Sequence, residues 1–220
     1  MRLVKTYATY VENEYDYKGR DSILTRFKKE VQGALEKREL ADYYFPEWGK
    51  ENRVIRSKDG KLTILTWDWE NNGSRHIYES MYRYVDDGKI TSGYLYDHEL
   101  SDAQLPSADY YEIHQLDDIS YLVQAWGTYG GGKEYFIMRK LNFKNGSLED
   151  CKKCFDGKDF LFYERNRGMK TAIHYDGDTK ILSYPRLVPG LLGGEETGFY
   201  EKAGDSIRLV YRNSEFVKFK

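Results

Sequence analysis

The chain has 220 residues, a length that suits a single domain able to bury a substantial core. Its 34 Lys and Arg residues nearly balance its 36 Asp and Glu residues, so it lacks the basic excess that is typical of nucleic-acid-binding proteins. No stretch approaches the apolar length that a membrane-spanning helix needs, and we therefore expect no transmembrane segment.

The first twenty residues are polar and rich in Tyr, and they contain no apolar segment of the kind found in secretory signals. We expect a strand over residues 3–11 and a turn at Lys18-Gly19. Two localisations stay open. The protein is periplasmic or located in the cell envelope if a signal has been removed, and otherwise it is cytoplasmic.

Residues 21–41 have the apolar spacing of a helix that packs on a sheet. Asp21 or Ser22 is placed to cap its N-terminus. The apolar stripe consists of Ile23, Phe27, Val31, Ala34 and Leu35, and the polar face consists of Arg26, Lys28, Lys29, Glu30 and Lys37. A partner-binding helix is the alternative interpretation of this stripe.

Everything from about residue 51 to residue 220 is typical of strands joined by tight turns. Asp59-Gly60 and Asn72-Gly73 are hairpin-turn pairs that frame a strand over residues 61–70, and a second strand follows over 77–84. Apolar residues lie on both faces of the first strand, which predicts a central strand. We expect Trp67 in the core and Trp69 partly exposed near the turn.

The turn signal recurs at Asp87-Gly88 and Asn145-Gly146, with a looser echo near Asp178. Pro185, Pro189 and four glycines in residues 185–198 predict an exposed loop there. The later strands are expected over 89–96, 110–116, 120–126, 134–143, 160–164, 171–175, 180–184, 207–211 and 216–219. The predicted fold is a single, mostly β domain, in which an antiparallel meander forms a sandwich or an open barrel and the one N-terminal helix packs on it. A small β-propeller is the alternative.

Residues 57–84 resemble a signature of uncharacterised, exported proteins of Gram-negative bacteria. That signature reads S-x-D-G-K-L-x-I-x-S-W-D and is followed by a Gly-rich turn and an aromatic strand. Thr66 stands where the family has Ser, and Asn72-Gly73-Ser74 replaces its Gly-Gly-Thr type of turn. The resemblance implies a β-rich fold and an envelope location, and it carries no catalytic residue. The matching positions are Ser57, Asp59, Gly60, Lys61, Leu62, Ile64, Trp67 and Asp68.

Motifs that fix a chemistry are scarce. Cys151 and Cys154 form one C-x-x-C pair, which is half a zinc site, so no tightly bound metal and no cofactor are expected. A local disulfide, idle thiols, weak metal binding and a redox role all stay open. The four His residues show no metal-ligand spacing, no G-x-S-x-G sequence occurs, and the Gly-rich residues 127–132 indicate a hairpin tip.

Polar residues beside aromatic rings at the end of the central hairpin form the candidate ligand site: Asp68, Trp69, Arg75 and His76. Such a site suits a carbohydrate or a peptide. The plainer alternative is a core Trp beside a solvated turn. The leading functional hypothesis is a non-enzymatic binding or structural module of the bacterial envelope. The alternative is a hydrolase that uses carboxylates such as Asp68 and Glu70.

Overall fold

The computed structural model describes residues 17–37, 53–72, 75–96, 105–171 and 173–219. For residues 17–21, 69–72 and 75 it describes the backbone alone. The strand expected over residues 3–11 lies outside the described residues. The elements of the described part are α2 Tyr17–Leu35, β1 Arg53–Arg56, β2 Leu62–Asn72, β3 Arg75–Asp86, β4 Lys89–Tyr96, β5 Asp109–Gln115, β6 Ser120–Gly130, β7 Lys133–Lys144, β8 Ser147–Asp150, β9 Phe160–Asn166, β10 His174–Asp176, β11 Ile181–Leu192, β12 Glu195–Arg212 and β13 Glu215–Lys218.

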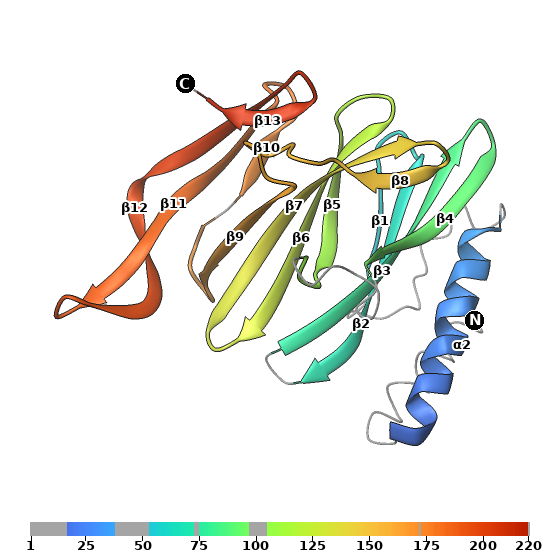
Figure 1. Ribbon diagram of the computed structural model, residues 1–220, viewed down its shortest axis with the longest axis horizontal. Coiled ribbons are helices and arrows are strands. Elements are labelled where there is room, and N and C mark those ends of the chain that lie inside the picture. The colour runs from blue at the N-terminus through green and yellow to red at the C-terminus, as the bar shows by residue number, and fades with distance from the viewer. Residues whose placement is uncertain (1–16, 38–52, 73–74, 97–104, 172, 220) are drawn as a thin grey trace.

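The predicted fold class is confirmed: the protein is mostly β, with antiparallel sheets that form a sandwich and, among the described residues, one helix. The strands make three sheets, which do not close into a barrel. Sheet A holds β1 to β4, sheet B holds β5 to β9, and sheet C holds β10 to β13. Figure 1 shows α2 on one side of the molecule and sheet C on the other, with sheets A and B between them.

Sheets A and B face one another across the largest core, and their strands join at one backbone pair, Arg75 with Tyr129. Leu62 and Ile64 of β2 enter this core from sheet A, and Tyr121 and Val123 of β6 enter it from sheet B. All four side chains are fully buried, as the alternation of strand side chains requires.

The other face of sheet A is covered by α2. Leu65, Trp67 and Met81 pack there against Phe27 and Val31 of the helix. β2 is therefore covered on both faces and lies between β1 and β3, which confirms the prediction of a central strand with a core Trp67.

The predicted bounds of the helix, residues 21–41, were wrong at both ends. The helix covers Tyr17–Leu35, so the turn expected at Lys18-Gly19 and the expected caps Asp21 and Ser22 lie inside it. The apolar periodicity that anchors the helix to sheet A stops at Leu35, and the helix stops there too.

Lys28 was also misplaced, because the sequence assigned it to the solvated face. Its side chain is buried beneath the helix, where its ammonium lies 2.8 Å from a carboxylate oxygen of the fully buried Glu79 on β3. A buried charge requires such a partner, and this one is distant in sequence.

Sheet C packs on the outer face of sheet B and forms a third core. Leu122 and Met138 of sheet B meet Leu182, Leu209 and Phe216 of sheet C there. All three cores form in the same way: a sheet buries an apolar face against the neighbouring layer.

The loop predicted over residues 185–198 is instead a long hairpin made by β11 and β12, which turns at Gly193-Gly194. Figure 1 shows it as an arm that extends away from the body. Pro185 and Pro189 are tolerated because β11 has no described neighbour on its other side past Ser183, and because the pairing is irregular after both prolines.

The strand expected over 171–175 is also shorter than predicted. Only β10, His174–Asp176, pairs with β11. The other predicted strands agree with the observed ones to within a few residues or are extended in the structure, whereas β1 and β8 were not predicted.

Candidate functional site

The hairpin of β2 and β3 brings two of the four predicted site residues together. Nδ1 of His76 lies 2.6 Å from Oδ2 of Asp68. Trp69 and Arg75 lie in the same hairpin, but their side chains are outside the described part of the structure. The pairing shifts by one residue at Trp69, so Asp68 pairs with Tyr78 while Asn71 pairs with His76. This bulge lets the carboxylate and the imidazole meet diagonally across the hairpin.

The His76–Asp68 pair lies at the end of the sandwich where the chain turns from β2 to β3 (Figure 1), on the face of sheet A that forms the core shared with sheet B. Tyr78 stacks on His76 with their ring centres 5.8 Å apart, and Trp126 of β6 lies 6.4 Å beyond Tyr78. Burial, followed by the charge of Asp68, raises the pKa of Tyr78. The phenol is therefore neutral and able to act as a hydrogen-bond donor.

A second ion pair lies beside the first, and no sequence pattern predicted it. Nε of Arg53 donates to Oδ2 of Asp109 at 2.9 Å. Burial, with a smaller contribution from the charge of Asp68, raises the pKa of Asp109 to about 6 against the opposing effect of Arg53. The other oxygen, Oδ1, is buried and has no hydrogen-bond partner among the described residues, which favours a proton on this carboxyl group.

An aromatic platform adjoins this polar cluster where β3 meets β6. The platform consists of Tyr129, Tyr135 and Phe162. The ring centre of Tyr135 lies 4.5 Å from that of Tyr129 and 5.4 Å from that of Phe162. Tyr129 is 50% exposed and Phe162 is 38% exposed. The backbone pair of Arg75 with Tyr129 places the platform next to the end of the predicted hairpin.

A glycine in the Gly-rich stretch is needed for this platform. A Cβ built on Gly127 would come within 2.4 Å of the Tyr135 ring, so only glycine lets that ring lie across β6. The Tyr135 hydroxyl then donates to the backbone oxygen of Ser107 at 2.5 Å. Part of the run that predicted a hairpin tip therefore shapes the platform.

The remaining motifs supply no further chemistry at this site. Cys151 and Cys154 are joined in a disulfide that follows β8. Among the described residues, no group of three or more His, Cys, Asp or Glu side chains is arranged to hold a metal ion. No helix in the described ranges combines the length and apolarity that a membrane crossing requires.

The arrangement is that of a β-sandwich with a cluster of polar and aromatic side chains at one end. Comparisons with protein-family models, with curated proteins and with solved structures found no match to this chain.

Proposed function

We propose that the protein is a non-enzymatic module that binds carbohydrate at this end of its sandwich. The observation that carries this proposal is the aromatic platform beside the two ion pairs, His76–Asp68 and Arg53–Asp109.

The chemistry of the surface matches a sugar. The exposed ring faces of Tyr129 and Phe162 are suited to cover the apolar C–H face of a sugar ring. The guanidinium of Arg53 and the imidazole of His76, which are partly exposed beside the two largely buried carboxyl groups, are suited to form hydrogen bonds with its hydroxyl groups. A peptide is the other ligand class that the sequence suggested, and it serves as the comparison in the test.

A hydrolase is the second candidate, because Asp109 and Asp68 are two carboxyl groups in one cluster with different proton affinities. A carboxyl group with a pKa of about 6 is able to act as a general acid near neutral pH, while a charged neighbour assists. Binding without catalysis remains the leading function, since Arg53 and His76 already hold one oxygen of each carboxyl group.

We further propose that the module works in the periplasm or cell envelope of a bacterium. The support is the Cys151–Cys154 disulfide, since disulfides persist mainly in oxidising compartments. Fractionation of a Gram-negative host that expresses the full-length gene tests this. Recovery in the cytoplasm with both thiols alkylatable would contradict it.

The binding test uses a panel of neutral oligosaccharides, with short peptides for comparison, and isothermal titration calorimetry on the intact chain. Tyr129→Ala and Phe162→Ala are expected to weaken oligosaccharide binding at least about fivefold, which is about 1 kcal/mol. The melting temperature should change little, because both rings are exposed.

Phe219→Ala is the matched control, since Phe219 is as exposed as Tyr129 but lies just after β13 in the chain, outside the platform. An equal loss of binding in this control, or the absence of oligosaccharide binding by the wild type, contradicts the proposal. Release of sugar from chromogenic glycosides that is lost in Asp109→Asn would favour the hydrolase.

A further inference from the structure

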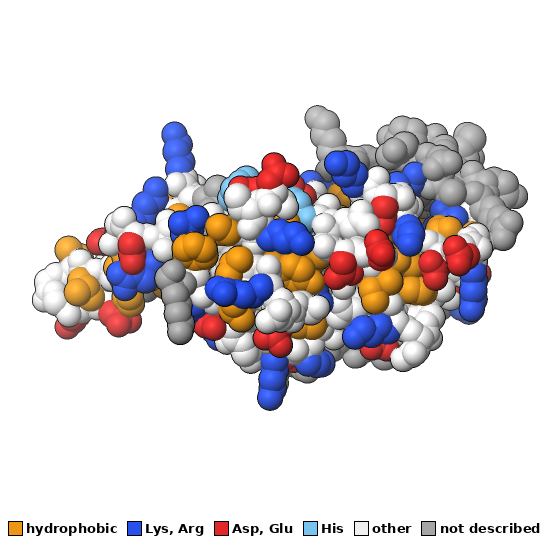
Figure 2. Space-filling view, turned by 90° about the horizontal axis from the view of Figure 1, so that it is seen from above, with side chains coloured by type: hydrophobic (Ala, Val, Ile, Leu, Met, Phe, Trp, Pro, Cys, Tyr) orange, Lys and Arg blue, Asp and Glu red, His pale blue; other side chains and the backbone are white. Residues whose placement is uncertain are grey.

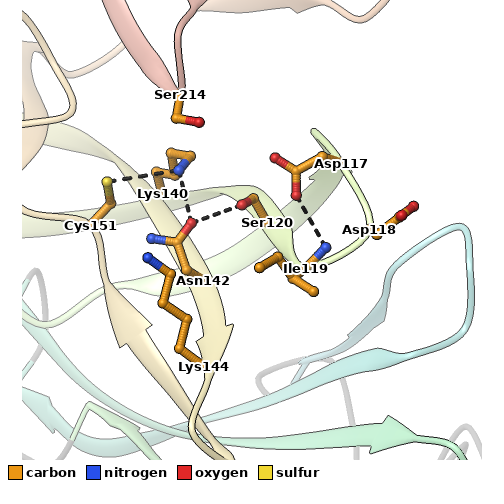
Figure 3. A pocket seen from close by; sticks show the side chains of 9 residues that line it. All are labelled: Asp117, Asp118, Ile119, Ser120, Lys140, Asn142, Lys144, Cys151 and Ser214. Atoms are coloured by element: carbon orange, nitrogen blue, oxygen red, sulfur yellow. Dashed lines mark hydrogen bonds between the residues drawn. The ribbon is translucent and has the colours of Figure 1, made fainter.

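A pocket of about 560 Å³ lies at the other end of β6 and β7, away from the aromatic platform (Figure 3). It belongs to the end of the molecule seen in Figure 2, where charged side chains of both signs surround apolar patches. Side chains from β7, from the β5–β6 connection and from the β12–β13 turn line it, among them Asp117, Ser120, Lys140, Asn142, Lys144 and Ser214.

One wall of the pocket carries hydrogen-bond donors. Lys140, Asn142 and Lys144 occupy alternate positions of β7, so their side chains project from the same face of the strand. Met138, two residues earlier on the same face, is buried against sheet C. The donor wall therefore continues the contact between sheets B and C outward into the pocket.

Lys140 is the unusual residue of this wall. It is 2% exposed, and its Nζ donates to Oδ1 of Asn142 at 2.8 Å and lies 3.7 Å from Sγ of Cys151. It forms no ion pair with any carboxylate of the described residues. An ammonium has three N–H donors, and a disulfide sulfur is a weak acceptor. Burial lowers the pKa of Lys140 despite the opposing charge of Asp117, and a bound carboxylate would offset the remaining penalty.

Asn142 adds a second donor with a fixed orientation. Its Oδ1 accepts from both Lys140 Nζ and Ser120 Oγ, each at 2.8 Å. Because an ammonium only donates, the atom that it contacts must be the amide oxygen. The amide nitrogen of Asn142 is thereby left as a donor, and it has no acceptor among the described residues.

The opposite wall carries the acceptor. Figure 3 shows the Asp117 carboxylate turned towards the pocket and the Asp118 carboxylate turned away from it. Asp117 accepts from the backbone nitrogen of Ile119 at 3.1 Å and from the Tyr211 hydroxyl at 3.3 Å. The Ser120 side chain is a third neighbour of this carboxylate. A carboxylate has about four acceptor positions, so acceptor capacity is left, and its charge would repel a ligand with two negative groups.

We infer that this pocket binds a small zwitterion, a molecule with one carboxylate and one ammonium group, such as an amino acid. The ligand carboxylate lies against Lys140, Asn142 and Lys144, and its ammonium lies against Asp117. The site is independent of the proposed carbohydrate surface and shares no residue with it.

The test follows chemical shifts of the intact protein as γ-aminobutyrate, butyrate and butylamine are added separately. γ-Aminobutyrate is expected to bind at least tenfold more tightly than either compound that has only one of its charges. Equal binding of butyrate would reduce the site to a simple anion site and overturn the inference. The absence of saturable shifts with all three probes would overturn it as well.

Two variants separate ligand binding from a structural role. Lys140→Met should weaken the binding of γ-aminobutyrate at least tenfold. The melting temperature should not fall, because removing a buried ammonium also removes the cost of its desolvation. Asp117→Asn should lower the affinity for γ-aminobutyrate to that for butyrate. Lys89→Met, on the exposed start of β4, is the control and should change neither. A Lys140→Met protein that melts earlier but binds normally would show a purely structural lysine.

Discussion

Phe27 offers the sharpest test of the layered packing, because it connects α2 to the centre of sheet A. Its side chain is fully buried and meets the Trp67 ring edge-on, with centres 5.4 Å apart. Phe27→Ala removes the ring and leaves a cavity between helix and sheet. Changes of this kind cost about 3 to 5 kcal/mol, of which the contact between the two rings supplies roughly 1 kcal/mol.

The loss is measured by urea unfolding and thermal melts, each followed by tryptophan fluorescence and far-UV circular dichroism. For a domain of this size, about 4 kcal/mol corresponds to a fall in melting temperature of roughly 10 °C. Thr25→Ala is the control on the same helix, because Thr25 is exposed, and it should change the free energy of unfolding by less than about 0.5 kcal/mol.

A double-mutant cycle with Trp67→Ala isolates the contact between the two rings. The cycle should give a coupling energy, since the two side chains touch and share one core. If Phe27→Ala melts like Thr25→Ala, or if the two substitutions add without coupling, then α2 does not pack on sheet A as described.

Three further predictions concern the buried charges and the tryptophans. Lys28→Met should cost about 3 to 5 kcal/mol in urea unfolding, because it leaves the Glu79 carboxylate without its ammonium partner, and Glu79→Leu in the same chain should restore most of the loss. Asp109 has a pKa of about 6 when folded, above the ordinary 3.8, so its contribution to stability is complete below pH 3.8 and is lost as the pH rises to about 6. This contribution amounts to roughly 3 kcal/mol, and Asp109→Asn should remove that part of the pH dependence. Trp67→Ala should lower the melting temperature, whereas Trp69→Ala should weaken ligand binding at the end of the β2–β3 hairpin. The reverse result would contradict the roles assigned to the two residues.

Much of the fold could be predicted from local signals. Asp87-Gly88 and Asn145-Gly146 adopt the positive φ angles of two-residue hairpin turns, and the strands beside them start and stop where those turns require. The signature residues Ser57 and Asp59 also have a structural role. Ser57 donates to Asp59, which in turn accepts from the Tyr121 hydroxyl of sheet B at 2.7 Å. Two of the positions that match the signature therefore stabilise the turn before β2.

What the sequence could not predict depends on contacts between distant segments. Asp109 and Arg53 are far apart in the chain, and only the approach of β1 to β5 brings them together. Lys28 was assigned to the solvated face because helical spacing gives no information on its partner, Glu79, which lies on a distant strand. The hairpin of β11 and β12 was not predicted because prolines usually end strands. The irregular pairing and the unpaired edge that accommodate these prolines depend on tertiary structure, which the local sequence does not show. The contact between Asp68 and His76 could be predicted because a single hairpin turn separates the two residues in the chain.

The two proposed sites occupy opposite ends of the same pair of strands, and this arrangement makes their independence testable. Ser120 starts β6 at the pocket, and Tyr129 lies near its other end, about 30 Å away at the usual rise of a strand. Substitutions that far apart with no shared partner should have additive effects. Tyr129→Ala should therefore weaken oligosaccharide binding and leave γ-aminobutyrate binding unchanged, and Lys140→Met should do the opposite. A variant that weakens both probes would show that β6 and β7 transmit strain between the two ends of the sandwich, or that the substitution has disturbed the whole fold. A normal melting temperature in that variant would point to the first explanation.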